Sequence, residues 1–236
     1  MKTVLVWDMP TRLFHWLLAT GCIASFTLAF SSSEHSQTFD WHMLCGLFLI
    51  PLIFFRLLWG FTGTTYSRFR SFIYSPRKAV AYLVRIISGN GERQLGHNPA
   101  ASYVILAMLT FIFSCLISGL LIPYSKIFKE MHEILTFILL GIIGTHFLGI
   151  LFHILVHKEN VILSMLTGTK MATGAMSIRS AHHIVAICLL VLIGIWSFAV
   201  IKSYDFTSRR VEVPLTGILL QLGKSAQDDA HQKNDD

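Results

Sequence analysis

Charged residues are scarce in this chain. Asp, Glu, Lys and Arg together make up 14% of its 236 residues, against about 25% in an average soluble domain. Hydrophobic residues make up 53%, and the mean hydropathy is +0.61. This balance excludes an ordinary water-soluble domain and indicates a protein that needs lipid around it. A nucleic-acid partner is not expected.

Cysteine motifs are absent as well. The absence of CxxC argues against a paired-cysteine zinc site and against thiol–disulfide exchange, and the absence of CxxCH argues against covalent haem attachment. We interpret the four single cysteines as small buried apolar residues. All of them lie within apolar stretches: Cys22, Cys45, Cys115 and Cys188.

Long apolar runs make up much of the sequence. A helix of about 20 apolar residues crosses the roughly 30 Å hydrocarbon core of a bilayer. Five runs come close to that length, near residues 14–31, 41–61, 101–122, 132–155 and 181–201. The sequence therefore predicts an all-α membrane protein with five transmembrane helices.

Lys and Arg are unevenly distributed among the connections. The connection between the first two runs has none, and the connection between the second and third runs has six: Arg68, Arg70, Arg77, Lys78, Arg85 and Arg93. Positive connections stay in the cytoplasm, so this bias predicts a cytoplasmic N-terminus and, with five spans, a periplasmic C-terminus. The positive charges of the tail after Lys202 run against this orientation.

Histidines are abundant, with eleven in the chain, and several lie inside or at the ends of the apolar runs. Ionisable groups at such positions are costly and are usually functional. His132 and His146 lie 14 residues apart on one expected helix, which places them about 40° apart in azimuth and about 21 Å apart along the axis. They share a face, with room for a haem near each membrane surface.

Depth in the membrane suggests the partners of these two histidines. His42 begins the second run at the level of His132, and His15 lies one turn into the first run, which favours the pairs His42–His132 and His15–His146. His153 lies about 20° from His146 in azimuth and is nearer the same surface, so geometry leaves both open. A structural role in helix–helix hydrogen bonding is the alternative for each histidine. Zinc is disfavoured because no carboxylate or Cys joins them.

Four short motifs resemble a known family. They are Trp7-Asp8-x-Pro10-Thr11-Arg12-Leu13-Phe14-His15-Trp16, Arg56-x-x-Trp59 leading through Gly63 to Tyr66-Ser67-Arg68-Phe69, Leu95-Gly96-His97-Asn98-Pro99, and Met165-Leu166-Thr167-Gly168. Over about residues 6–168 the chain resembles the bacterial di-haem b-type cytochromes that include the membrane subunit of nickel-iron hydrogenases. The resemblance implies a four-helix haem-binding bundle, to which this chain adds a fifth helix.

The resemblance also implies a set of ligands. The family's axial histidines match His15, His42, His132 and His146, which would hold two non-covalent b haems. It favours His146 over His153 because of the spacing to Met165–Gly168, and leaves His153, Arg12 and Arg56 as candidate contacts of the haem propionates. The expected organisation is a cytochrome core at 1–168, a fifth helix at 169–202 and a polar tail at 203–236, whose last part, 224–236, is expected to be disordered.

The function that follows from the resemblance is electron transfer in the bacterial inner membrane. It implies electron exchange between the quinone pool and a redox partner such as a hydrogenase or a periplasmic cytochrome c. The chain would be the electron-transfer subunit of such a system rather than a complete enzyme. His97 is a candidate quinone contact, although the Asn98-Pro99 that follows is also a helix-start signal. The alternatives are a self-standing superoxide or quinone oxidoreductase, and a haem-free anchor or transporter.

Overall fold

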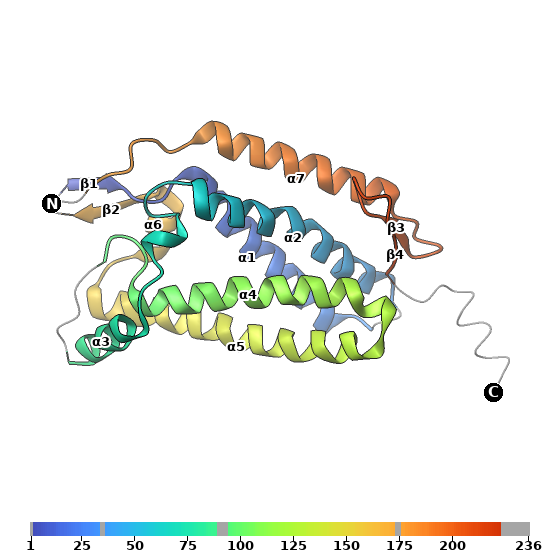
Figure 1. Cartoon of the computed structure of the whole chain (residues 1–236), viewed down its shortest axis with the longest axis horizontal. Helices are drawn as coiled ribbons and strands as arrows, with labels where there is room; N and C mark the ends of the chain where they lie inside the picture. The colour runs from blue at the N-terminus through green and yellow to red at the C-terminus, as the bar shows by residue number, and fades with distance from the viewer. Residues whose placement is uncertain (1, 34–35, 89–93, 173–175, 223–236) are drawn as a thin grey trace.

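The computed structural model describes residues 2–33, 36–88, 94–172 and 176–222 (Figure 1). Within them it has five helices long and apolar enough to cross a membrane. The prediction of an all-α membrane protein with five such helices is confirmed. They are α1 (Met9–Ser31), α2 (Gln37–Thr62), α4 (Pro99–Leu121), α5 (Lys126–His157) and α7 (His183–Ser203).

Short elements mark the two ends of this bundle (Figure 1). At one end, which we call the β1 end, β1 (Lys2–Leu5) pairs antiparallel with β2 (Thr169–Ala172). The same end carries three short helices: η1 (Phe69–Ser71), α3 (Pro76–Ile87) and α6 (Val161–Thr167). At the other end, the hairpin end, β3 (Arg210–Glu212) pairs with β4 (Leu219–Gln221), and η2 (Ile122–Tyr124) links α4 to α5. The segment 224–236, expected to be disordered, lies outside the described residues.

Local sequence explains where the helices start. Asp8 caps α1 by accepting a hydrogen bond from Thr11 N at 2.8 Å, and Asn98 caps α4 in the same way through Ala101 N at 2.7 Å. Each cap is followed closely by a proline, Pro10 or Pro99, which fits a first helical turn because its missing N–H is not needed there. The helix-start reading of Asn98-Pro99 is thus correct.

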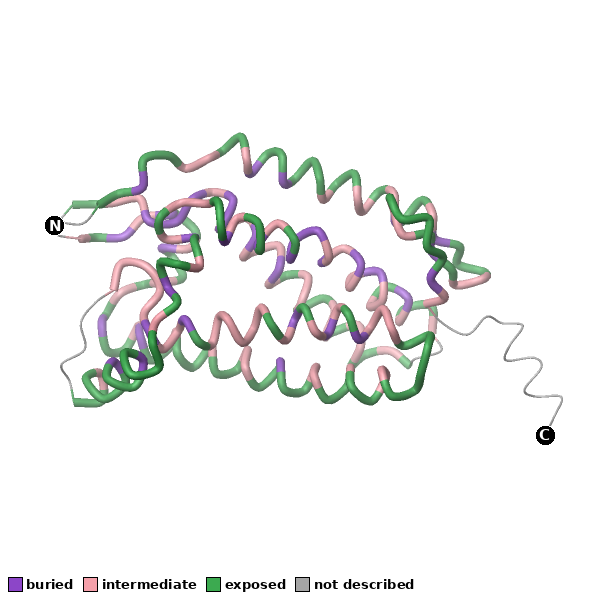
Figure 2. Tube along the Cα trace, viewed as in Figure 1, coloured by how far each residue is buried: buried purple, intermediate pink, exposed green. Residues whose placement is uncertain are grey.

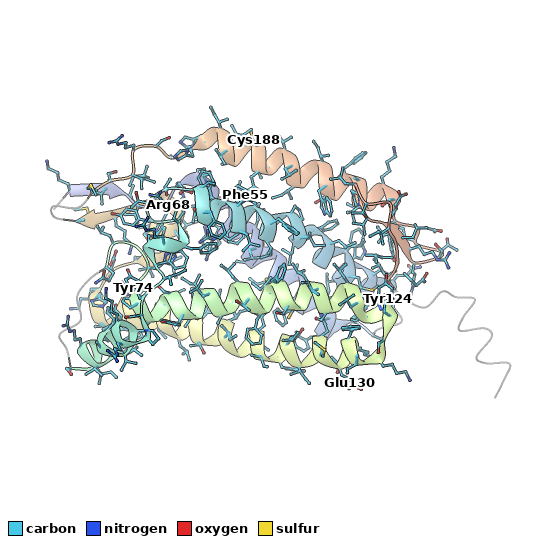
Figure 3. The ribbon with its side chains drawn as sticks, viewed as in Figure 1. Phe55, Arg68, Tyr74, Tyr124, Glu130 and Cys188 are labelled. Carbon is cyan, nitrogen blue, oxygen red and sulfur yellow. The ribbon has the colours of Figure 1, made fainter. Side chains whose placement is uncertain are left out.

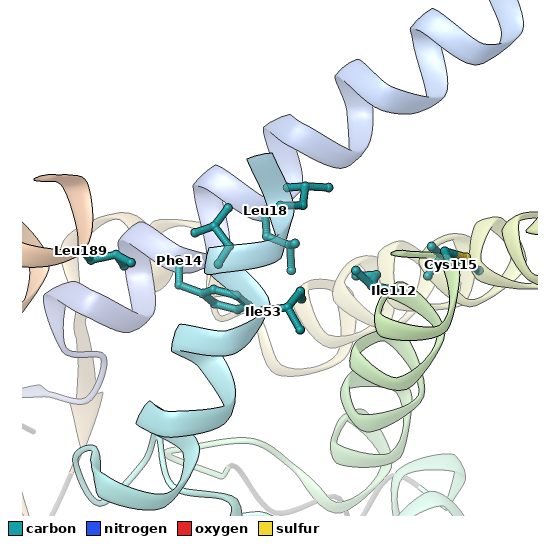
Figure 4. Packing of buried hydrophobic residues seen from close by; sticks show 9 residues of the cluster. Phe14, Leu18, Ile53, Ile112, Cys115 and Leu189 are labelled. Carbon is teal, nitrogen blue, oxygen red and sulfur yellow. The ribbon is translucent and has the colours of Figure 1, made fainter. Parts of the chain in front are cut away.

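Two helix hairpins form the body of the bundle. The α1–α2 hairpin and the α4–α5 hairpin lie against each other, and α7 lies along α2 and α1 (Figure 1). Their shared core contains Phe14, Leu18, Leu49, Leu52, Ile53, Ile112, Cys115, Leu139 and Leu189 (Figure 4). The outer faces of α5 and α7 are exposed (Figure 2) and apolar, with Ile184 78% exposed and Leu148 68% exposed. Such faces are stable against lipid.

The α3 helix divides its surface into three faces. Ala79 and Tyr82 are buried against the protein, whereas Val80, Leu83, Val84 and Ile87 are exposed apolar residues. Arg77, Lys78 and Arg85 are exposed on a third face. This arrangement is typical of a helix that lies in the membrane–water interface. Figure 3 shows Arg68 and Tyr74 at the same end of the bundle, with Tyr124 and Glu130 at the other.

Candidate haem sites at the two ends of the bundle

His42 of α2 and His132 of α5 face each other at the hairpin end. Their ring centres lie 6.2 Å apart, with an interplanar angle of 80°. Two imidazoles that share one metal ion, each with a metal–nitrogen distance of about 2 Å, have ring centres about 6 Å apart. The spacing therefore suits an iron atom held between the two rings.

The Nδ1 atoms of both rings are already occupied. His42 Nδ1 lies 2.9 Å from the carbonyl oxygen of Ser25, and His132 Nδ1 lies 3.0 Å from that of Cys115. A carbonyl can only accept, so Nδ1 carries the proton and Nε2 is the nitrogen left for a metal. This is the usual orienting contact of a metal-ligating histidine. Serine hydroxyls add a second contact, Ser25 Oγ at 3.0 Å and Ser118 Oγ at 3.1 Å.

A glycine of α4 stands beside the His132 ring, and a second glycine lies on α2. A Cβ atom at Gly119 would lie 3.3 Å from His132 Cε1, so the glycine lets α4 approach the ring closely. Gly46, one turn after His42, has room instead, because the nearest atom to a Cβ there would be Leu116 Cδ2 at 4.0 Å. The hairpin-end site thus fits a flat group held by two histidines.

His15 of α1 and His146 of α5 lie towards the β1 end. The two rings are close enough to interact electrostatically. His15 Nδ1 is buried and has no hydrogen-bond partner among the described residues. The structure thus brings these two predicted residues into one region. Unlike the rings of the hairpin-end pair, the His15 ring has no backbone carbonyl at Nδ1 among the described residues.

Two arginines, both predicted as propionate contacts, flank this region. Arg56 is 4% exposed and lies over the ring of Phe69 at 4.8 Å, and its Nη1 has no hydrogen-bond partner among the described residues. A buried guanidinium with a free N–H group is suited to an anion such as a haem propionate. Arg12 is engaged differently, because its Nη2 donates to the carbonyl of Leu166.

The side chain of His153 contacts a residue that follows α5. His153 Nε2 lies 3.3 Å from Glu159 Oε2, and Lys170 Nζ lies 3.2 Å from Glu159 Oε1. The hydrogen bond from His153, together with the charge and hydrogen bond of Lys170, lowers the pKa of Glu159 from 4.5 to about 2. His153 therefore faces a carboxylate at the end of the helix, in a setting unlike that of His146.

His97 lies in the connection before α4, between the aromatic rings of Trp7 at 4.8 Å and Phe72 at 4.6 Å. Burial, followed by the charges of Arg56, Lys170, His146 and His15, lowers the pKa of His97 to about 3. The imidazole is therefore neutral at pH 7. Its Nδ1 has no hydrogen-bond partner among the described residues.

Comparison with known proteins assigns the sequence to a family. Residues 6–168 match the family model described as prokaryotic cytochrome b561. The chain belongs to this family. It is a multi-pass bacterial membrane protein of a b-type cytochrome family, and this family implies haem b.

A curated relative points in the same direction. The cytochrome is 27% identical over 139 residues to the "Probable Ni/Fe-hydrogenase B-type cytochrome subunit" of Bradyrhizobium diazoefficiens, which covers 50% of this chain and 56% of that protein. The match thus spans about half the length of the relative. No solved structure matches the cytochrome.

Sequence reasoning missed several residues that support the histidines. Ser25 and Ser118 carry no signal of their own until the helix hairpins are known. Asp8 is fully buried and accepts hydrogen bonds from Trp59 Nε1 at 3.1 Å and Thr64 Oγ1 at 2.5 Å, which ties the start of α1 to the end of α2. Its place beside Trp7 in the first motif was the available signal.

Proposed function

We propose that the cytochrome binds two b haems without covalent attachment, one at each end of the bundle, and transfers electrons between a quinone and a redox partner. The observation that carries this proposal is the facing pair His42 and His132, 6.2 Å apart, with both Nδ1 atoms held by backbone carbonyls. Haem b ligated by two histidines supplies a reversible one-electron couple with no open iron position.

The second pair of ligands in this proposal is His15 and His146. His146 is preferred to His153 because His153 Nε2 faces Glu159, whereas His146 shares its electrostatic surroundings with His15. Arg56 is the proposed propionate contact, since its buried Nη1 is free to donate. Phe14, Phe69 and Phe72 surround this guanidinium and would keep water away from the contact.

The β1 end is the proposed cytoplasmic end. Arg68, Arg70 and the charged residues of α3 are exposed there, as the positive-inside rule requires. The hairpin end then faces the periplasm of a bacterial inner membrane and would meet the redox partner, a hydrogenase or a periplasmic cytochrome c. The name of the Bradyrhizobium relative supports a hydrogenase.

A polar cavity of about 380 Å³ at the β1 end is the proposed site of the quinone headgroup. His97 lines it together with Tyr66, Tyr74 and Gln94. Neutral His97 has a free Nδ1, which can hydrogen-bond to an oxygen of a quinone or a quinol. The electrostatic interaction of His97 with His15 and His146 supports a quinone site near the proposed second pair of ligands.

Haem content tests the central part of this proposal. Purified cytochrome should contain two haems per chain and show a b-type reduced-minus-oxidised spectrum. A colourless protein from haem-replete cells would overturn the proposal and return the histidines to structural roles. Turnover of superoxide and quinone by the purified chain alone would replace the subunit function with that of a self-standing oxidoreductase.

A substitution tests the quinone site. His97→Phe should keep both haems reducible by dithionite but slow their reduction by a quinol at least tenfold, because the hydrogen-bonding nitrogens of His97 are lost from the lining of the cavity. His183→Gln is the matched control, since His183 is exposed at the start of α7 on the same end. Equal quinol rates in both variants would remove His97 from the site.

A further inference from the structure

Asp40 is a buried carboxylate at the hairpin end. It lies in the first turn of α2, two residues before His42, and is 0% exposed. Neither of its oxygens has a hydrogen-bond partner among the described residues. A buried charge in such a setting is costly unless another charge compensates it.

Arg209, from the chain beyond α7, supplies the compensating charge. Its Nε lies 3.7 Å from Asp40 Oδ1, and its side chain is 12% exposed. The backbone of Arg209 has a left-handed φ of 52°, and its carbonyl accepts a hydrogen bond from Leu222 N at 2.9 Å. The β3–β4 hairpin therefore holds the arginine in place. Tyr204 lies beside the same carboxylate, and burial together with this carboxylate raises the pKa of the phenol.

Apolar packing reinforces this ion pair. A second buried cluster joins α2 to α7 and the hairpin through Leu44, Leu47, Val200, Tyr204, Val211 and Leu220. Trp196 of α7 adds a hydrogen bond from Nε1 to the carbonyl of Leu47 at 2.9 Å. The segment after residue 168 thus builds a core of its own on one side of α2.

His42 is on the opposite side of the same turns. Asp40, Leu44 and Leu47 lie about 140–200° around the helix axis from His42. The His42 ring contacts α1 through Ser25, whereas the α7 side of the helix is held by the ion pair and the second cluster. The first turns of α2 are therefore held by α1 on one side and by α7 and the β3–β4 hairpin on the other.

We propose that Arg209 is a positioning residue for the hairpin-end haem: through Asp40 it fixes the first turn of α2, and hence His42, and it balances a buried negative charge two residues from this ligand. This inference rests on the proposed function, because it assumes a haem between His42 and His132. It gives a role to a segment that lies outside the family match at residues 6–168.

Redox potentials separate this role from simple structural support. Arg209→Gln leaves a buried, unpaired negative charge two residues from the ligand His42, which favours the ferric form. The midpoint potential of one haem should fall enough to change its reduced-to-oxidised ratio at least tenfold, or about 59 mV for one electron. Asp40→Asn should shift the same haem in the opposite direction. Arg209→Lys should restore most of the wild-type potential.

The protein provides two controls. Arg210→Gln alters the neighbouring arginine, which is exposed and pairs with Gln221 Oε1 at 2.7 Å, and should leave both potentials unchanged. The haem at the β1 end is an internal control, because it lies at the other end of the bundle. A spectroelectrochemical titration of purified protein, with low-temperature EPR of the ferric haems, resolves the two.

Each outcome decides the proposal. If Arg209→Gln loses the hairpin-end haem, the double variant Asp40→Asn/Arg209→Gln should regain it, because no buried charge is left unpaired. Loss that persists in the double variant, or wild-type potentials in both single variants, would overturn the positioning role. Wild-type protein without a hairpin-end haem would instead overturn the proposed function itself, so the two failures are distinguishable.

Discussion

At the hairpin end, His42 and His132 point at each other across 6.2 Å, and backbone carbonyls fix both rings. At the β1 end, His15 Nδ1 has no hydrogen-bond partner among the described residues, and Arg56 and His97 lie in the same electrostatic neighbourhood. Main-chain carbonyls thus orient both rings at the hairpin end, whereas charged and polar side chains lie around the pair at the β1 end.

In the proposed function, this difference gives the two haems of one fold different surroundings. A carbonyl that accepts from Nδ1–H orients the ring and makes Nε2 a better ligand, but it brings no net charge. A buried guanidinium brings a full positive charge, which favours the reduced iron. In the proposed function, backbone carbonyls thus fix the ligand geometry at the hairpin end, and the Arg56 charge raises the potential at the β1 end.

Removing a ligand should have the largest effect. His42→Ala should lower the haem content from two to one per chain, because His132 alone cannot complete the hairpin-end site. His153→Ala is the matched control on α5 and should keep both haems. The pyridine haemochrome assay measures the number of haems per chain. Two haems in His42→Ala would show that His42 is not needed for a haem at the hairpin end.

Removing the charge at the β1 end should have the next largest effect. Arg56→Met should keep both haems but lower the potential of one of them by about 59 mV or more, a tenfold change in its reduced-to-oxidised ratio. Arg68→Met, at an exposed arginine on the same end, is the control. A shift of the hairpin-end haem alone would contradict the assignment of Arg56 to the β1 end.

Acid should affect the contact at the end of α5. The pKa of Glu159 is lowered from 4.5 to about 2, first by His153 and then by Lys170. A lowered carboxyl pKa contributes stability that is complete above the ordinary value and is lost as the pH falls through the lowered one. The Tm advantage of wild type over Glu159→Gln should be constant above pH 4.5 and vanish near pH 2. A difference that does not change with pH would contradict the ion pair.

The serine contacts at the hairpin end should matter least. Ser25→Ala removes one hydroxyl but leaves the Ser25 carbonyl as the acceptor for His42 Nδ1, so both haems should remain. The expected loss is about 1 kcal/mol of stability, measured by urea unfolding. Ser203→Ala is a control at the same end, because its hydroxyl bonds only backbone carbonyls in the described contacts. A lost haem in Ser25→Ala would mean that the carbonyl alone does not hold the ring.

The five helices were predictable because each needs only a long apolar run. Their starts extend beyond those runs, since Asp8 and Asn98 add capped polar turns to α1 and α4. The β1–β2 pairing was missed, because Lys2 pairs with Ala172 and no local pattern reports so distant a partner. The hairpin after α7 was missed for another reason: its short strands are stabilised by packing on α2 rather than by their own sequence.

The choice between His146 and His153 could not be made from helix geometry. Seven residues are almost two full turns, so both histidines share a face, and azimuth cannot separate them. Glu159 distinguishes them in the structure, because it lies 3.3 Å from His153 Nε2 and follows the end of the helix. That contact depends on the path of the chain after α5, which the pattern of apolar residues does not encode.

The separation between each hairpin-end histidine and its carbonyl partner is the same, 17 residues, in both helix hairpins. Each ring therefore bridges two antiparallel helices near their connection. If one helix slid by a turn against its neighbour, its imidazole would lose its acceptor and rotate. The angle between the two ring planes, which the anisotropy of a ferric haem spectrum records, would thus serve as a gauge of helix register inside an intact membrane.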